Sequence, residues 1–134
     1  MVTLRRVNPK ALGPAIGYSH GVRAGNALHI AGQIGGTPKG DGTWTMKRGF
    51  AAQFEKALEN LVQVVEAEGG SPEDVVEMVM FVTDMPAYRR SRKQLGPAWR
   101  RVMGSHYPAI TMVGVTDLYE RGSLIEIRAV ALLE

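Results

Sequence analysis

The sequence predicts an α/β (α+β) fold in one domain, residues 1–134, with a mixed sheet of about six strands and two helices on one face. Three observations lead to this fold class. Three strand-like segments come first, long helical patterns then alternate with strands, and 134 residues is the length of one domain with its own core. The predicted order of elements is β-β-β-α-β-α-β-β.

The N-terminal third is predicted to be mostly strand. Residues 1–8 form the first strand, which Pro9 ends because proline cannot donate to a ladder. Residues 18–24 and 27–34 predict a hairpin around Gly25-Asn26, two residues that tolerate positive φ. The glycine-rich residues 35–47 predict a flexible loop and not a phosphate cradle, since no GKS/T and no strand-to-helix context follows.

Two helices and a strand follow. Residues 50–68 repeat apolar side chains every three to four positions, which predicts a helix that Gly69-Gly70 ends. After a connector with room for a short helical turn, residues 75–84 are almost all apolar and predict a strand covered on both faces. Residues 87–103 predict a second helix, which we expect Gly96-Pro97 to kink or restart.

The C-terminal segment predicts two strands, residues 109–118 and 123–133, with a turn at residues 120–122. In the second strand the odd positions from Ile125 to Leu133 form an unbroken apolar face. Glu126 and Arg128 share the other face with apolar neighbours. This leaves two interpretations open: a salt bridge on a covered surface, or a carboxylate presented to a ligand.

Composition narrows the function classes. The chain has no cysteine, which excludes disulfides, thiolate metal sites and a cysteine nucleophile. No apolar run reaches the ~18 residues of a membrane span, and the first residues lack the apolar core of a signal peptide, so we expect a cytoplasmic protein. A basic cluster at residues 89–101 predicts either a nucleic-acid footprint or a solvated helix face; without an accompanying aromatic platform we favour the helix face.

The predicted elements leave one face of the sheet uncovered. Two helices cover one face only, and the apolar strands present more surface than these helices can bury. Exposed apolar area of this kind marks interfaces, so the sequence predicts an oligomer.

Several motifs together resemble the YjgF/RidA family, also described as endoribonuclease L-PSP, over nearly the whole chain. They are residues 17–34, residues 57–61, Val82-Thr83-Asp84-Met85, Tyr107-Pro108-Ala109 and Ile125-Glu126-Ile127. The resemblance implies a chorismate-mutase-like fold and a homotrimer with small-molecule clefts between subunits. It also implies hydrolysis of reactive enamines and imines to a 2-oxo acid and ammonia, without metal or bound cofactor.

The resemblance also implies site residues. The family's cleft glutamate and tyrosine match Glu126 and Tyr18, which we predict to position water and to donate a proton. The family's arginine after Pro-Ala, which grips a substrate carboxylate by two hydrogen bonds, is replaced by Ile110. Ala31 stands where the family often has serine, and Gly32 keeps a close backbone approach possible.

Two further polar residues belong to the predicted site. Arg128 either replaces the missing charge or neutralises Glu126, two positions away on the same face, and we favour neutralisation. His20 is placed near the site by its motif, with a loop or interface role as the alternative.

The sequence therefore predicts an enamine or imine hydrolase whose substrate is altered by Ile110. The alternative is a non-catalytic, trimeric small-molecule-binding protein. An RNA-cleaving or translation-inhibiting protein ranks last, and a nucleic-acid partner is not expected.

Overall fold

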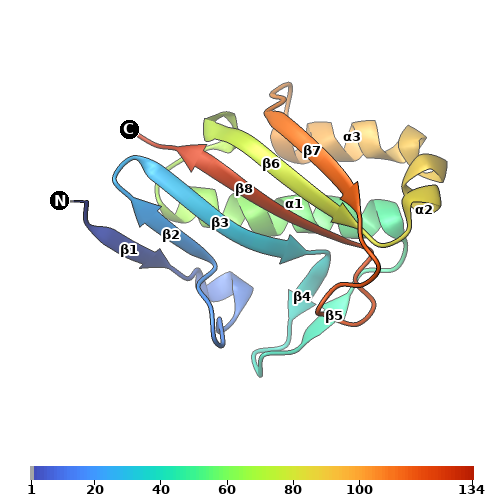
Figure 1. Ribbon diagram of the computed structural model, residues 1–134, viewed down its shortest axis with the longest axis horizontal. Helices are drawn as coiled ribbons and strands as arrows, with labels where there is room; N and C mark the ends of the chain where they lie inside the picture. Colours follow the sequence, from blue (N-terminus) through green and yellow to red (C-terminus); the bar gives the residue numbers. More distant parts are fainter. Residues whose placement is uncertain (1) are drawn as a thin grey trace.

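The computed structural model describes residues 2–134 and contains a six-stranded sheet with helices on one face (Figure 1). Its strand order is β1-β2-β3-β8-β6-β7. The strands are β1 (Leu4–Val7), β2 (Gly21–Ala24), β3 (Ala27–Ile34), β6 (Val75–Val82), β7 (Ala109–Gly114) and β8 (Ile125–Leu132). Only β6 and β7 pair in parallel, so the sheet is mixed and the predicted fold class is confirmed.

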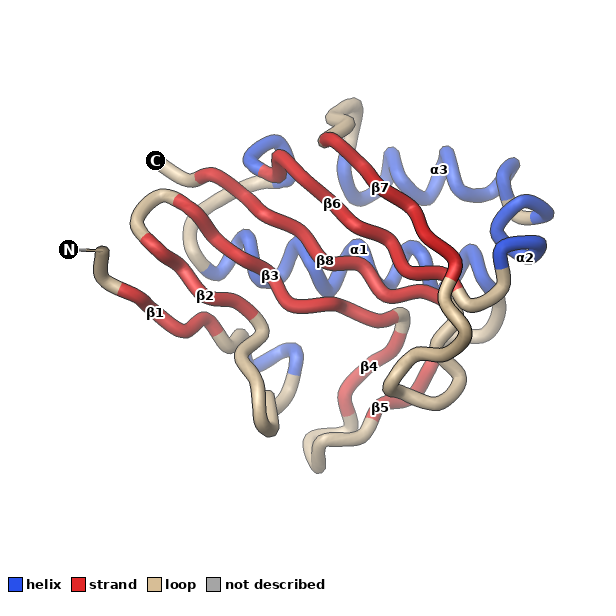
Figure 2. Tube along the Cα trace, viewed as in Figure 1, coloured by secondary structure: helices blue, strands red, loops and turns tan. Residues whose placement is uncertain are grey.

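Helices α1 (Phe50–Ala67), α2 (Met85–Arg90) and α3 (Arg92–Met103) lie on one side of this sheet (Figure 2). The core forms between them and the inward face of the strands. The Ile125, Ile127 and Ala131 side chains are fully buried there, opposite Leu58 and Leu61 of α1. The unbroken apolar face predicted for the last strand is therefore the face that packs on the helices.

The opposite side of the sheet, here called the open face, is covered by no element of residues 2–134 (Figure 2). β6 was expected to be covered on both faces, and this expectation is wrong for the single chain, because burial alternates along the strand. The side chains on the open face are mainly apolar and include Val79, Phe81, Val113, Val130 and Leu132. Leu132 is 53% exposed and Val113 is 37% exposed.

The hairpin between β2 and β3 is confirmed, with Ala24 opposite Ala27. Only Gly25 has positive φ (62°), so Asn26 does not use the tolerance assigned to it. Residues 18–20 lie outside β2, so the predicted strand was three residues too long at its start.

Residues 35–47 are not the flexible loop that was predicted. They contain a two-stranded sheet of β4 (Gly36–Pro38) and β5 (Trp44–Met46). Asp41 accepts a hydrogen bond from the Thr43 backbone N–H (2.9 Å) and so shapes the turn between them. Strands of three residues are too short for their period to be recognised in the sequence.

The break in the second helical region lies at Ser91, and α3 runs through Gly96-Pro97, so the predicted restart of the helix there was wrong. Pro97 lies inside α3. A proline normally clashes with the Cβ of the residue before it, and Gly96 has none. The short helical turn allowed between α1 and β6 is present at residues 72–74.

The two C-terminal strands do not pair with each other, because β6 lies between them. β7 ends at Gly114, four residues earlier than predicted, and residues 115–124 form a long connection across the end of the sheet. The predicted turn is present: the Ser123 N–H donates to the Glu120 carbonyl (3.2 Å), and Gly122 has a φ of 84°.

No helix among residues 2–134 combines the length and the apolar character needed to cross a bilayer.

Candidate functional site

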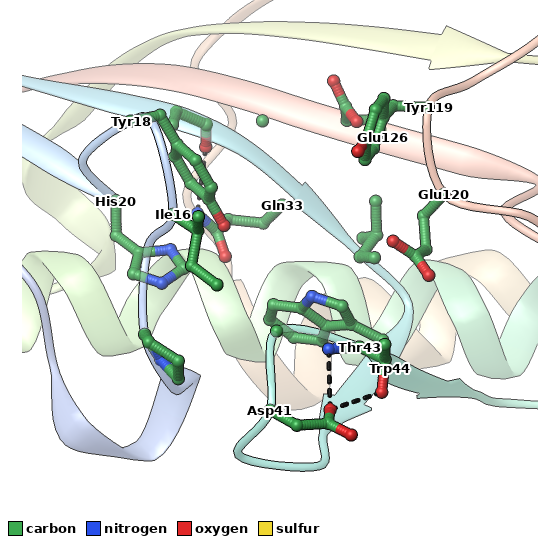
Figure 3. Close-up of a pocket in the computed structure, with 15 residues that line it drawn as sticks. Ile16, Tyr18, His20, Gln33, Asp41, Thr43, Trp44, Tyr119, Glu120 and Glu126 are labelled. Carbon is green, nitrogen blue, oxygen red and sulfur yellow. Dashed lines mark hydrogen bonds between the residues drawn. The ribbon is translucent and has the colours of Figure 1, made fainter.

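A cavity of about 440 Å³ opens where β3 and β8 meet the loops at one end of the sheet (Figure 3). β3 and β8 supply Ala31, Gly32 and Glu126. Tyr18 and His20 come from the segment before β2, Asp41 and Trp44 from the β4–β5 hairpin, and Glu120 from the connection before β8. The cavity thus gathers residues that are far apart in the sequence.

Glu126 is one of three carboxylates that line the cavity, and its side chain lies on the same side of the sheet as the open face. Burial raises the pKa of this carboxyl. Among residues 2–134, no hydrogen bond or ion pair reaches its oxygens. A half-buried carboxylate without a partner is free to bind a ligand or take up a proton.

Gly32 makes room for this carboxylate. Ile30 pairs with Ala129 and Gln33 with Ile127, so β3 carries a bulge at Ala31-Gly32. A Cβ on Gly32 would lie only 2.7 Å from the Glu126 Cγ. The lack of a side chain at Gly32 thus lets the Glu126 carboxylate lie in this position, which any larger residue would displace.

Tyr18 is half exposed on another side of the cavity. Its pKa is raised, mainly by burial and then by the charges of Glu120 and Glu126. The phenol therefore keeps its proton at neutral pH and can donate it in a hydrogen bond to a ligand.

His20 is fully buried in the cavity wall, and its ring meets the Tyr18 ring edge to face, with 5.3 Å between centroids. Its Nε2 lies 3.3 Å from the Gly13 carbonyl. Because a carbonyl only accepts, Nε2 carries the hydrogen and Nδ1 keeps a free lone pair. Burial lowers the pKa of this imidazole, and Nδ1 has no hydrogen-bond partner among the described residues.

Two residues of the predicted site do not line the cavity of their own chain. Ile110 lies on β7, which β6 separates from β8, and its side chain does not line the cavity. Arg128 is exposed on the open face and makes no ion pair with Glu126. The predicted neutralisation of Glu126 by Arg128 is therefore wrong for this chain, because a twisted strand lets the two side chains reach different surroundings.

Sequence reasoning missed ten of the lining residues, and four of these carry a charge or an aromatic ring: Asp41, Trp44, Tyr119 and Glu120. All four lie in segments interpreted as a loop or a turn, where no periodic pattern exists. The only signal available was a tryptophan and a tyrosine in polar segments. Within residues 2–134, no group of three or more His, Asp or Glu side chains is arranged to hold a metal ion.

The raised pKa of Glu126 predicts a pH-dependent stability. The folded protein binds this proton more tightly than the unfolded chain, whose glutamate pKa is about 4.3. Its stabilising contribution is complete below that pKa and is lost as pH rises through the raised folded pKa. We expect Glu126→Gln, which cannot ionise, to gain in melting temperature relative to wild type between pH 4 and pH 7.

The control for this experiment is Glu66→Gln, on the exposed side of α1. The difference in melting temperature between Glu66→Gln and wild type should not grow in the same way from pH 4 to pH 7. A difference for Glu126→Gln that shrinks as pH rises would contradict the prediction.

Comparisons with known proteins agree on one family. A family model described as endoribonuclease L-PSP matches residues 8–133. A RutC family protein of Pyrococcus horikoshii is 35% identical over 127 residues, which cover 94% of this chain and 92% of that protein. The 2-iminobutanoate/2-iminopropanoate deaminase of Escherichia coli K12 is 32% identical over 92% of this chain and 90% of its own length.

Solved structures give the same result. The YjgF gene product of E. coli superposes with a TM-score of 0.84 at 29% identity, covering 97% of this chain and 99% of that one. RidA from an Antarctic Psychrobacter superposes with a TM-score of 0.81 at 30% identity, covering 96% of this chain and 99% of that one.

Proposed function

The chain belongs to the YjgF/RidA family, whose model is described as endoribonuclease L-PSP, and from this premise we propose that it hydrolyses reactive imines and enamines. Relatives named 2-iminobutanoate/2-iminopropanoate deaminase support this reaction class. The observation that carries the proposal is the unpaired, half-buried carboxylate of Glu126, which shares one cavity with the protonated Tyr18.

The proposed reaction needs a base for water and an acid for nitrogen. As water attacks the imine carbon, Glu126 accepts one of its protons and Tyr18 donates a proton to the nitrogen, which gives a carbinolamine. The carbon–nitrogen bond then breaks. The nitrogen leaves as ammonia with the proton from Glu126, while the hydroxyl proton returns to Tyr18 and a carbonyl forms.

We place this reaction in a cleft between copies of the chain in a homotrimer. The open face is apolar and uncovered, and Glu126 lies on the same side of β8 as Val130 and Leu132. A second copy seated there would bury this apolar area and border the cavity. The absence of cysteine suits the cytoplasm as the setting.

The direct test is a panel of imines generated in situ, some with and some without a carboxylate. The initial rate of trapping by semicarbazide falls when an imine is hydrolysed before it is trapped. We expect the protein to lower this rate for at least one imine. If no imine is hydrolysed faster than in buffer alone, the proposed function fails.

Ile110→Arg tests the role of the missing clamp. We expect this substitution to raise kcat/KM for 2-imino acids at least tenfold, because a bidentate arginine contributes both affinity and orientation. Ile110 does not line the cavity of its own chain, so this gain requires the β7 edge of a neighbouring copy to reach it. Light scattering on the same samples should give three times 14.6 kDa.

Ile110→Lys is the matched control for Ile110→Arg, because it adds a charge without the bidentate geometry and should give a smaller gain. An unchanged rate for Ile110→Arg in a trimer would contradict the prediction.

The second candidate is a non-catalytic trimeric binding protein, which the loss of the arginine at position 110 favours. It predicts binding in the cavity without imine hydrolysis. An RNA-directed function has less support, because Arg101 of the basic cluster is paired with Glu55 (2.7 Å) on α1.

A further inference from the structure

The walls of the cavity are rich in negative charge. Carboxylates reach it from three separate elements: Glu126 from β8, Glu120 from the connection before β8, and Asp41 from the turn of the β4–β5 hairpin (Figure 3). Within one chain, no lysine or arginine of residues 2–134 lines it. Among residues 2–134, ion pairs occupy none of these three carboxylates. A second carboxylate brought by a ligand would be repelled here.

The buried imidazole of His20 adds an independent observation. Its Nδ1 is a hydrogen-bond acceptor with no partner among the described residues, and the residue is only 1% exposed in the cavity wall, beside Ile16 and Tyr18 (Figure 3). An acceptor left unpaired in a buried position costs stability, so it calls for a donor. Like the three carboxylates, it is complementary to a ligand that brings N–H groups.

Aromatic rings supply another part of the walls. Tyr18, Trp44 and Tyr119 line the cavity, and Tyr119 is 97% exposed. Aromatic faces attract cations through their quadrupole, and more strongly when water is excluded. Carboxylates combined with aromatic rings are the walls that suit an organic cation.

We propose that the natural substrate is the iminium ion of a primary amine, a cation without a carboxylate. The inference rests on the proposed hydrolysis and names its substrate class. Written with its charge, R–CH=NH₂⁺ reacts with water to give R–CHO and NH₄⁺, so one carbon–oxygen double bond replaces the carbon–nitrogen double bond and the charge leaves with nitrogen. The reaction that supplies such a substrate is the oxidation of a primary amine.

Binding can be tested separately from catalysis with three probes of the same size. Benzylammonium, benzyl alcohol and benzoate share one ring and differ in charge. We expect calorimetry to give benzylammonium a Kd at least tenfold lower than that of benzoate, and lower than that of benzyl alcohol. Because the attraction is electrostatic, added salt should weaken the binding of benzylammonium more than that of benzyl alcohol.

Glu120→Gln is the informative variant, because its partly exposed side chain makes no hydrogen bond or ion pair among the described residues. This substitution should raise the Kd of benzylammonium about three- to tenfold and leave the Kd of benzyl alcohol unchanged. Glu66→Gln, on the exposed side of α1, removes the same charge far from the cavity and should change neither of these two Kd values.

The outcomes separate this inference from the proposed function. Benzoate binding as tightly as benzylammonium, no benzylammonium binding, or equal effects of Glu120→Gln and Glu66→Gln would each overturn the cationic substrate class. Faster hydrolysis of 2-imino acids than of imines from amine oxidation would also overturn it, while the hydrolase proposal would stand. Tight benzylammonium binding without hydrolysis of any imine would support the ligand class and reject the enzyme.

Discussion

Glu126→Gln is expected to lower the catalysed rate of imine hydrolysis at least about 100-fold, the usual contribution of a positioned general base. The amide keeps the shape of the carboxylate but cannot accept a proton from water. Since Glu126 makes no hydrogen bond or ion pair among the described residues, its replacement breaks no structural contact. The loss should therefore appear in kcat, without a loss of folded protein.

The measurement is single-turnover hydrolysis of whichever imine the wild type prefers, beside thermal unfolding of the same samples. Glu66→Gln serves again as the matched control and should retain the wild-type rate. If Glu126→Gln keeps more than a tenth of that rate, Glu126 is not the base. An equal rate for both variants would show that the hydrolysis does not depend on the Glu126 carboxylate.

Gly35→Ala should lower the free energy of unfolding by about 3 kcal/mol or more, because it forces a side chain into a filled space. A Cβ at this position would meet the Gln53 Cα and lie 2.5 Å from the Gln53 carbonyl oxygen. These are backbone atoms of α1, which cannot rotate away as a flexible side chain can. Such a loss is a large part of the roughly 5–15 kcal/mol that stabilises a domain.

The close contact between Gly35 and α1 is fixed by hydrogen bonds to the residues on either side of Gly35. Asn60 Nδ2 donates to the Ile34 and Gly36 carbonyls, both at 2.9 Å, and so fixes residues 34–36 on α1. The β3–β4 junction cannot retreat from the helix without breaking these bonds. The β4–β5 hairpin, which carries Asp41 and Trp44 to the cavity, should therefore be loosened together with the fold.

Urea denaturation followed by circular dichroism measures the effect, with the slope m compared to confirm two-state unfolding. Gly114→Ala is the matched control, because its Cβ would have only ordinary contacts of 3.8 and 3.9 Å. It should change stability by no more than about 0.5 kcal/mol. Equal shifts in the two variants would show that the close approach at Gly35 does not determine the cost.

Local patterns predicted much of the fold. The period of α1, the apolar face of β8 and the hairpin at Gly25-Asn26 were recognisable because each depends on neighbours in the chain. The same patterns misplaced the helix break and extended β7, because Gly96 offsets Pro97 and the end of a strand depends on its partner. The strands β4 and β5 were too short to carry a signal.

The sequence by itself determined the α+β fold class, the family motifs and the residues Tyr18, Gly32 and Glu126. The fold class follows from the order of local patterns, and each motif and residue belongs to a continuous segment that can be recognised without the structure. Only the tertiary structure decided what surrounds Glu126. Pairing of β3 with β8 places Glu126, and the β4–β5 hairpin and the connection before β8 bring Asp41, Trp44 and Glu120 to the same cavity. Within one chain, Arg128 and Ile110 stay outside it. The charge of a cavity is a sum over residues distant in sequence, so no local pattern contains it.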